Sequence, residues 1–527
     1  MGICGSTNTK QRQENNTAKN LQINDANLRD EDAEAIRKGA LSSRDPQIAI
    51  NSDVIISKSD VNPEVKYVKI RKLGAGGFGE VWLVRHKELK KEFAMKIIQK
   101  QKNRASEEKE IMNEVKILKT LDHPKVLKIL DFYSTSDKFY IITDYCPNGE
   151  LFKEIQNVGK FDEGSAAFIM NQVLKIVKYC HSMNIIHRDL KPENIMIESR
   201  EKNRCIQIKI IDFGTAKIFE KGQPENRYVG SSYYIAPEVI QRKYTEKCDL
   251  WSCGVILYIL LTGRAPFEGD DDDEIIQSVR KGKYDTCSAP FPLLSYEAKN
   301  LIKGLLEMDP KKRLSADEAL NHNWFKSAKF LDKQKINEIS LSQATDILNN
   351  IKTFKTKNMI RTLAVAFLVH HMTDSSECDE TSKLFHQIDT NCDGKIQKEE
   401  LIDGLIKYWK VSRSQATKDA NEIFSNLDTD QNGYIEYEEF VRAAIDPDCL
   451  VQNNYMKFAF DYLDRDKSGQ ITIDEIVKRL AQNAKNAKDC SKIESEVKNM
   501  FKDIDISGDG KISFNEFCKM METLFSY

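Results

Sequence analysis

The 527-residue sequence predicts an α+β protein of about three domains, and three observations support this. Short β-branched and apolar runs alternate with turns in the first third, as at 92–98, which predicts a small antiparallel sheet. Long stretches with a 3.6-residue apolar period follow, such as 163–183, and predict an α-rich lobe. Residues 380–527 carry an internal repeat of polar loops between helical segments. We therefore expect one bilobal domain that ends near Phe330, followed by an all-α region.

The composition excludes several classes of protein. Hydrophobic residues make up 40% and charged residues 30%, which is typical of a soluble globular protein. The net charge of −2 argues against a nucleic-acid partner bound through a basic surface. The 12 cysteines show no C-x-x-C spacing, so we expect reduced thiols in a cytoplasmic protein, with neither zinc nor disulfides. The longest apolar run, 254–261, is far shorter than a membrane span and predicts a buried helix.

The N-terminal segment differs from the rest of the chain. Residues 1–60 contain no aromatic residue and are predicted to form a disordered arm. The start MGICGS fits an N-myristoylation signal on Gly2. One acyl chain binds a membrane only marginally, so Cys4 is the candidate for a second, palmitoyl chain. This predicts reversible membrane association; the alternative is a chance match in a soluble tail.

A glycine-rich segment, LGAGGFGEV at 73–81, contains the pattern G-x-G-x-x-G. A dinucleotide-binding fold shares this pattern but continues into a helix, whereas EVWLVRH at 80–86 predicts a strand. Glycines allow the backbone to approach the phosphates of ATP and to offer N–H donors. The predicted contacts of this segment with ATP are Leu73, Gly74, Ala75, Gly76, Gly77, Phe78, Gly79 and Val81.

Three further motifs and one glutamate supply the charged groups that phosphoryl transfer requires. Lys96 in FAMK can reach the α- and β-phosphates of ATP, and Glu114 can pair with it. In HRDLKPEN, Asp189 can accept the proton of a substrate hydroxyl, and Asn194 can bind Mg²⁺. Asp212 in DFG is the second predicted Mg²⁺ ligand. Each of these residues alone could be an ordinary exposed charge. Their occurrence together, in this order, indicates a site for phosphoryl transfer.

These motifs resemble those of the protein kinases over residues 68–326. The resemblance implies that Lys191 is the lysine with which Ser/Thr-specific kinases neutralise the transferred phosphate. It places Thr143 at the gatekeeper position behind the adenine site, before hinge residues Asp144 to Cys146. By the same resemblance, Glu150 and Glu193 bind an arginine upstream of the phosphoacceptor, which implies basic protein substrates.

The resemblance also assigns structural roles and raises a question about activation. Asp249 and Arg313 are expected to be structural, with Arg313 as the partner of Glu238. The acidic run 270–274 is interpreted as an exposed helix N-terminus rather than a metal site.

The segment 212–238 contains no Ser or Thr between Ala216 and Gly230, where many kinases are phosphorylated. We expect Glu225 to pair with Arg188 in place of a phosphate.

Four segments fit the calcium-loop pattern D-x-[DNS]-x-[DNS]-G-x₅-E: 389–400, 428–439, 464–475 and 505–516. Oxygens at loop positions 1, 3, 5 and 12 and a backbone carbonyl at position 7 bind Ca²⁺, while Gly at position 6 makes the turn. Position 8 is always Ile, which suits a short β-bridge between paired loops. The predicted calcium ligands are Asp389, Asn391, Asp393, Lys395, Glu400, Asp428, Asp430, Asn432, Tyr434, Glu439, Asp464, Asp466, Ser468, Gln470, Glu475, Asp505, Ser507, Asp509, Lys511 and Glu516.

Residues 335–372 connect the two regions and are predicted to be helical. Ile347, Ile351 and Phe354 recur at helical spacing within 347–369, and lysines lie between them. A basic amphipathic helix is a typical target of open EF-hands. The alternative is a structural helix packed on the first domain.

This order of parts resembles the calcium-dependent protein kinases, in which a calmodulin-like domain of four EF-hands (380–527) follows its own target. The resemblance implies a monomeric Ser/Thr kinase that uses ATP, Mg²⁺ and Ca²⁺ and is autoinhibited by its junction. Two rivals remain open: a Ca²⁺-regulated scaffold or pseudokinase, and an always-active kinase that merely buffers Ca²⁺. Intact Lys96, Asp189, Asn194 and Asp212 argue against the scaffold.

Overall fold

The structure is a computed structural model of the whole chain. It describes residues 55–56, 58–76, 79–100, 105–201, 205–220, 222–327, 338–354, 359–371, 376–428, 432–445, 453–481 and 487–522. Gly2 and Cys4 therefore lie outside the described residues.

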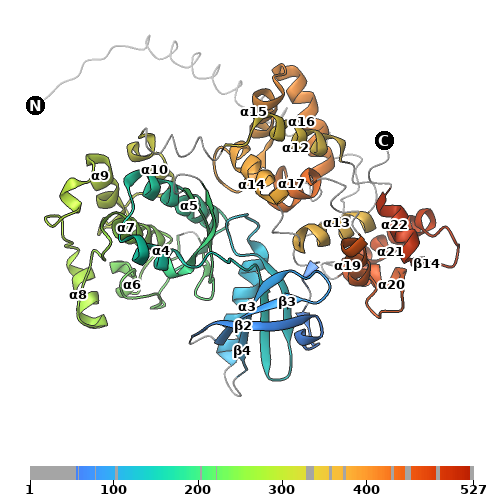
Figure 1. The fold of residues 1–527 in the computed structure, drawn as a ribbon, viewed down its shortest axis with the longest axis horizontal. Helices are drawn as coiled ribbons and strands as arrows, with labels where there is room; N and C mark the ends of the chain where they lie inside the picture. Colours follow the sequence, from blue (N-terminus) through green and yellow to red (C-terminus); the bar gives the residue numbers. More distant parts are fainter. Residues whose placement is uncertain are drawn as a thin grey trace, which may run out of the picture. The chain divides into compact units, whose positions relative to one another are not determined.

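A six-stranded sheet with strand order β1-β5-β6-β4-β3-β2 forms the first lobe, together with helix α3 (Figure 1). The strands predicted at 80–86 and 92–98 are confirmed. The strands are β1 (Lys58–Ser59), β2 (Tyr67–Gly76), β3 (Gly79–His86), β4 (Glu92–Gln99), β5 (Ile129–Ser134) and β6 (Lys138–Thr143), and α3 is Ala105–Thr120. Successive side chains of β4 alternate between buried and partly exposed, as expected for a strand with one covered face.

The first strand corrects the predicted extent of the N-terminal arm. Lys58 and Ser59 pair in parallel with Phe132 and Tyr133 of β5. The side chains of Ile55 and Ile56 are 4% and 1% exposed. The end of segment 1–60 is therefore folded, because two isoleucines bury apolar surface even though no aromatic residue is present.

The second lobe is helical and is built around α7, which is buried along its whole length. Residues 254–261 lie within this helix, so the predicted buried helix is confirmed. The helices of the lobe are α4 (Leu151–Val158), α5 (Glu163–Ser182), α6 (Pro237–Ile240), α7 (Lys247–Thr262), α8 (Asp272–Lys281), α9 (Tyr296–Leu305), α10 (Ala316–Leu320), η4 (Phe291–Leu293) and η5 (Asn323–Lys326). Helix α8 begins in the acidic run, where the Asp271 side chain accepts a hydrogen bond from the backbone of Glu274.

Short strands on this lobe carry the loops of the candidate site. The strands β8 and β9 pair with each other, and β7 pairs with β10. Their bounds are β7 (Ile185–Ile186), β8 (Ile195–Glu201), β9 (Cys205–Ile210) and β10 (Lys217–Ile218), with the turn η2 (Pro192–Asn194) before β8. The loop 187–191 therefore lies between β7 and η2, and the DFG residues follow β9.

The C-terminal region consists of helices separated by loops with short antiparallel strand pairs. Ile396 lies opposite Ile435, and Ile471 lies opposite Ile512, so the predicted bridges at loop position 8 are confirmed. The elements are α14 (Ser376–Ile388), β11 (Lys395–Gln397), α15 (Lys398–Trp409), α16 (Arg413–Leu427), β12 (Tyr434–Glu436), α17 (Tyr437–Ala444), α19 (Asn453–Leu463), β13 (Gln470–Thr472), α20 (Ile473–Leu480), α21 (Ala487–Ile504), β14 (Lys511–Ser513) and α22 (Phe514–Glu522).

The connector forms two helices rather than one, α12 (Leu341–Thr353) and α13 (Met359–His371). Phe354 has an extended backbone with φ −61° and ψ 128°, which ends α12. Helix α12 contacts α14, α15, α16 and α17, whereas α13 contacts α17, α19 and α21. The helix predicted within 347–369 is therefore divided into two helices, which contact two groups of helices.

Within the described part of the chain, no helix is both long and apolar enough to cross a membrane. The nine cysteines whose side chains the structure describes are all free thiols.

Candidate functional site

The lysine and glutamate of the first lobe form the predicted ion pair. Lys96 Nζ on β4 lies 2.6 Å from Glu114 Oε1 on α3 and 3.8 Å from Asp212 Oδ1. Burial would lower the pKa of Lys96, but the charges of Glu114 and Asp212 raise it above its usual value. Lys96 is thus held as a cation between the sheet and the DFG residues.

The glycine-rich segment joins β2 and β3. Leu73 to Gly76 lie on β2, Gly79 and Val81 lie on β3, and Gly77 and Phe78 lie outside the described residues. Gly79 has a φ of +122°, and a Cβ atom there would come within 2.1 Å of the carbonyl oxygen of Ile97. Only glycine fits this close approach of two strands.

Three side chains converge on Asp189. Lys191 Nζ lies 2.7 Å from Asp189 Oδ2 and donates to Ser231 Oγ at 2.8 Å. Ser231 in turn donates its hydroxyl and its backbone N–H to Asp189 Oδ1, at 2.8 and 3.0 Å. Asn194 Nδ2 donates to the Asp189 carbonyl at 2.9 Å. Ser231 was not predicted from the sequence, although this hydroxyl-bearing residue directly follows Gly230 within the segment 212–238.

The protonation of Asp189 follows from these contacts. Burial would raise its pKa, but the hydrogen bonds from Lys191 and Ser231 and the charge of Lys191 outweigh burial and lower it. The carboxylate is therefore ionised at neutral pH and can accept a hydrogen bond from a hydroxyl.

Asp249, on the buried helix α7, fixes the loop that carries Asp189. Its Oδ2 accepts hydrogen bonds from the His187 backbone at 3.0 Å and from His181 Nε2 at 2.9 Å. Its Oδ1 accepts from the Arg188 backbone at 2.9 Å. Arg188 has a φ of +68°, an unfavourable conformation that these bonds hold in place. The structural role predicted for Asp249 agrees with this geometry.

The predicted pairing of Arg188 with Glu225 is wrong. Arg188 Nε donates to the carbonyl of Thr215 at 2.7 Å, and Nη1 donates to the Tyr244 hydroxyl at 3.3 Å. Glu225 Oε2 instead pairs with Lys217 Nζ at 2.7 Å. The guanidinium of Arg188 thus binds a carbonyl and a phenol, whereas the carboxylate of Glu225 is neutralised by Lys217.

The predicted hinge lies at the end of β6. Thr143 and Asp144 are buried, and Cys146 follows at 8% exposure. The carboxylate of Asp144 pairs with Lys209 Nζ at 2.9 Å. The Asp144 side chain is therefore engaged with Lys209, which leaves the hinge backbone as the group able to meet an adenine.

The remaining predicted residues of this domain have different surroundings. Arg313 and Glu238 form a buried ion pair with Nη2 2.9 Å from Oε2, which confirms the predicted partnership. Glu150 pairs with Lys153 at 3.2 Å. Glu193 has one buried carboxylate oxygen without a hydrogen-bond partner, and burial raises its pKa. A cationic side chain would satisfy that oxygen.

The calcium-loop residues fold as loops around their first carboxylate. In all four loops, the backbone N–H of position 6 donates to the aspartate at position 1. The position-6 glycines adopt left-handed conformations that favour glycine: Gly394 (φ +78°), Gly433 (+87°), Gly469 (+82°) and Gly510 (+79°).

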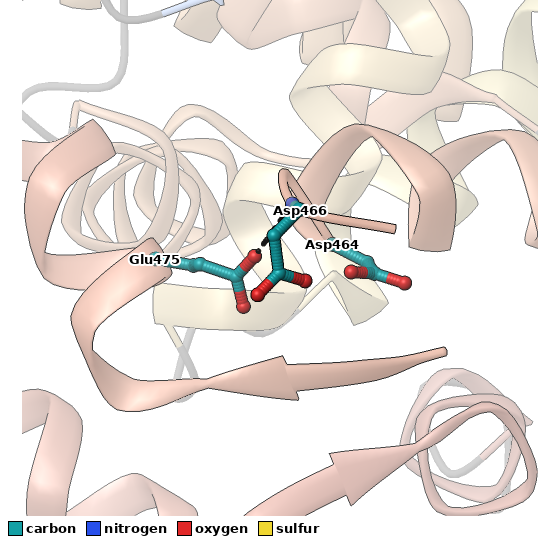
Figure 2. A group of neighbouring side chains, drawn as sticks. All are labelled: Asp464, Asp466 and Glu475. Atoms are coloured by element: carbon teal, nitrogen blue, oxygen red, sulfur yellow. Dashed lines mark hydrogen bonds between the residues drawn. The ribbon is translucent and has the colours of Figure 1, made fainter. Parts of the chain in front are cut away.

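The third loop shows the donor set most fully. One oxygen each of Asp464, Asp466 and Glu475 lie within 4.8 Å of one another, and Figure 2 shows these three side chains gathered at the loop. Glu475 is fixed by backbone N–H groups of Arg465 and Thr472, at 2.7 and 2.9 Å. Clustered carboxylate oxygens are the ligands that Ca²⁺ prefers, so these residues fit the cation.

The other loops have similar arrangements. Loop one draws Asp389, Asn391 and Asp393 together through backbone hydrogen bonds. Burial, and then the nearby charges of Asp393 and Glu400, raise the pKa of Asp389 to about 7. Of the predicted calcium ligands, Asp430 lies outside the described residues.

The calcium-loop region also contacts the kinase-like lobes directly. Glu438 precedes the last residue of loop two, and its carboxylate lies 2.7 Å from Lys128 Nζ and 2.8 Å from His370 Nδ1. The other ring nitrogen of His370 hydrogen-bonds the carbonyl of Ile129 at 2.9 Å. In loop one, Lys178 of α5 donates to the carbonyl of Asn391. Helix α13, the second calcium loop and β5 thus meet at one buried group of polar atoms.

Comparisons with known proteins agree with this geometry. Residues 67–325 match the protein kinase domain family, and residues 381–445 and 453–522 each match the EF-hand domain pair. The chain is 36% identical to calcium-dependent protein kinase 4 of Plasmodium falciparum over 537 residues, covering 100% of this chain and 99% of the relative. It is 33% identical to calcium-dependent protein kinase 33 of Arabidopsis thaliana over 482 residues, covering 91% and 89%. The chain therefore belongs to the calcium-dependent protein kinases and is an ATP-dependent Ser/Thr protein kinase that calcium activates.

Proposed function

We propose that this kinase phosphorylates Ser or Thr in basic protein segments, and that Ca²⁺ binding to its own four loops relieves inhibition by the junction 335–372. In the transfer step, Asp189 accepts the hydroxyl proton and Lys191 neutralises the phosphate in flight. Lys96, held by Glu114, positions the α- and β-phosphates. Asn194 and Asp212 would hold Mg²⁺, which would supply neutralisation of the phosphate charge.

One observation carries the regulatory part of the proposal. The apolar face of α12 belongs to the same buried cluster as the helices of the first EF-hand pair. Ala344, Leu348 and Ile351 of α12 pack there with Phe385 and Phe440. The junction helix and the calcium-binding helices share a core. A change in the angle between the EF-hand helices therefore changes the packing around α12.

The switch needs only modest bias at each loop. Moving a two-state equilibrium from 1:99 to 99:1 takes about 5.5 kcal/mol of differential binding. Spread over four loops, this is roughly 1.4 kcal/mol each, or about tenfold in affinity between the two states. In the calcium-poor state the junction occupies the substrate cleft; in the loaded state the EF-hands retain it.

Substrate choice and location complete the proposal. Glu193, with its unpartnered buried oxygen, and Glu150 bind a basic side chain upstream of the phosphoacceptor. Gly2 carries myristate and Cys4 palmitate, which together attach the kinase reversibly to membranes. The motif MGICGS supports both lipids.

A single assay tests the activity and its control. Phosphate transfer from ATP to a basic Ser-containing peptide is measured with Ca²⁺ and with a chelator, using Asp212→Ala as the inactive control. We expect transfer in Ca²⁺ to exceed transfer in chelator by at least tenfold. Equal rates in both conditions would overturn the switch, and absence of transfer in both would favour a scaffold.

A further inference from the structure

The N-terminal arm ends where three parts of the protein meet. Ile55 and Ile56 are almost fully buried, and Val61, six residues after Ile55, is 57% exposed. Strand β1 begins two residues after Ile56 and covers the β5 edge of the kinase sheet. An uncovered edge strand readily pairs with another segment, so β5 is a suitable receptor for the arm.

Two backbone carbonyls of the arm connect it to different domains. Lys119 Nζ, at the end of α3, donates to the carbonyl of Ile56 at 2.6 Å. The hydroxyl of Tyr462, on α19 of the third EF-hand, donates to the carbonyl of Ile55 at 3.3 Å. Neighbouring residues of the arm are therefore bound by the kinase and by the calcium-binding region.

Tyr462 is itself placed at a point that calcium occupancy affects. It lies two residues before Asp464, the first ligand of loop three. Its ring stacks on Phe367 of junction helix α13 with centroids 3.7 Å apart. The guanidinium of Arg479, from the exit helix α20, lies 3.6 Å from the centre of the same ring. Because Ca²⁺ changes the angle between the two helices of a sensor EF-hand, Tyr462 moves relative to one of its partners when the loop loads.

We propose that four described residues of the arm, Ile55, Ile56, Lys58 and Ser59, form a calcium-coupled latch. β5, Lys119 and Tyr462 together capture this latch, and its capture stabilises the docked state of the EF-hands. This rests on the proposed calcium switch and extends it to the N-terminal arm. By linkage, the factor by which the bound arm tightens calcium binding equals the factor by which calcium tightens arm binding. The acylation motif at Gly2 lies on the same arm, so the latch joins the membrane-attached end of the chain to the calcium sensor.

Two measurements on the full-length protein test the latch. The first is hydrogen exchange of peptides covering residues 55–60, with Ca²⁺ and with chelator. We expect Ca²⁺ to slow exchange at least fivefold, on the order of the smallest couplings seen between linked sites. Equal exchange in both conditions would overturn the proposal.

The second measurement is the Ca²⁺ concentration for half-maximal peptide phosphorylation. The double variant Ile55→Ser, Ile56→Ser should raise it about fivefold, because the arm loses its apolar contacts while keeping its carbonyls. Tyr462→Phe keeps the ring stacking and loses the hydroxyl, so it should shift the concentration in the same direction by less. The matched control, Val61→Ser, changes an exposed residue just after the latch and should leave the concentration unchanged.

The outcomes separate failure of the latch from failure of the switch. If the wild type responds to Ca²⁺ and the Ile55/Ile56 variant responds within twofold of it, the latch is wrong and the switch stands. If the double variant does not fold, Tyr462→Phe decides, and an unchanged response overturns the latch. If the wild type ignores Ca²⁺, the switch is wrong, and hydrogen exchange of the arm still decides whether calcium and the arm are coupled.

Discussion

Ser231 shows how a single hydroxyl adjusts the group around Asp189. It donates a hydrogen bond to Asp189 and accepts one from Lys191, so it fixes the two side chains relative to each other. Since Ser231 contacts the proposed base rather than the reacting phosphate, it is a positioning residue. Hydrogen bonds to charged groups contribute about 1.5–3 kcal/mol, enough to matter for a base that must be aligned.

Replacing this hydroxyl tests its role. We expect Ser231→Ala to lower kcat by on the order of tenfold, with a smaller change in the KM for ATP. The hydrogen bond from Ser231 helps to lower the pKa of Asp189, so its loss raises that pKa and moves the acidic limb of the rate profile to higher pH. Steady-state kinetics across pH measure both effects.

Two comparison variants accompany this prediction. Ser231→Thr keeps the hydroxyl and should restore most of the rate. Ser232→Ala removes the neighbouring hydroxyl, which bonds Asp272 instead, and should leave the profile unchanged. An acidic limb that does not move in Ser231→Ala would contradict the positioning role.

At the scale of elements, the two junction helices divide their contacts between two groups of EF-hand helices. Leu348 of α12 is fully buried in the cluster with the first EF-hand pair, and its neighbour Asn349 is exposed. Two adjacent residues of one helix, one buried and one exposed, therefore offer a matched pair of substitutions.

We predict that Leu348→Asp raises the Ca²⁺ concentration for half-maximal activity by at least tenfold. A carboxylate inside an apolar cluster is unpaired and strongly disfavoured, so the EF-hands lose affinity for α12. Asn349→Asp introduces the same charge at an exposed position and should have little effect. Calcium titrations of peptide phosphorylation compare the two, and equal shifts would contradict the shared core.

The first calcium loop offers a second matched pair. Gly394 and Gly433 occupy position 6 of their loops with similar positive φ angles. A Cβ atom on Gly394 would come within 2.3 Å of the Tyr179 ring on α5, whereas a Cβ atom on Gly433 would meet nothing within 4 Å. Of these two glycines, only Gly394 therefore lies against the kinase.

We expect Gly394→Ala and Gly433→Ala to weaken calcium binding at their own loops, since each forces alanine into a left-handed conformation that costs roughly 1–2 kcal/mol. Gly394→Ala should in addition weaken docking of the EF-hand region on α5. Small-angle scattering with Ca²⁺ measures this as a larger radius of gyration for Gly394→Ala alone. Identical radii for the two variants would contradict the contact.

At the scale of the whole molecule, the calcium-binding region and the kinase are joined by buried polar contacts. Burial would raise the pKa of Glu438, but the charge of Lys128 and the hydrogen bond from His370 hold it well below its usual range. Glu438 therefore remains an anion inside the contact, next to the last ligand of loop two. Such a contact favours one docked arrangement over others, because each charge needs its partner.

Removal of everything after residue 335 tests how the regulatory region acts. If the junction only blocks the cleft, the remaining kinase should phosphorylate a basic peptide at similar rates with Ca²⁺ and with chelator. The control is Asp212→Ala in the same shortened chain, which should be inactive. An inert shortened kinase would show that docking of the EF-hands is itself required for activity.

Local chemistry made much of this protein predictable from its sequence. The residues of the HRDLKPEN motif and of the calcium loops stand at fixed spacing within short segments. The partners of Arg188 were not predictable in this way. Thr215, Tyr244 and Lys217 compete for the neighbourhood of Arg188 and Glu225, and distance in the folded chain decides among them.

The sequence by itself thus determined the two kinds of chemistry, phosphoryl transfer and calcium binding, because each requires particular side chains in short motifs that follow one another in a recognisable order. Only the tertiary structure decided that the junction breaks at Phe354 into two helices and that Ile55 and Ile56 are buried. It also placed Tyr462 beside residues that are far from it along the chain. These features depend on contacts between residues distant in sequence, and burial against a particular neighbour leaves no periodic signature in the sequence.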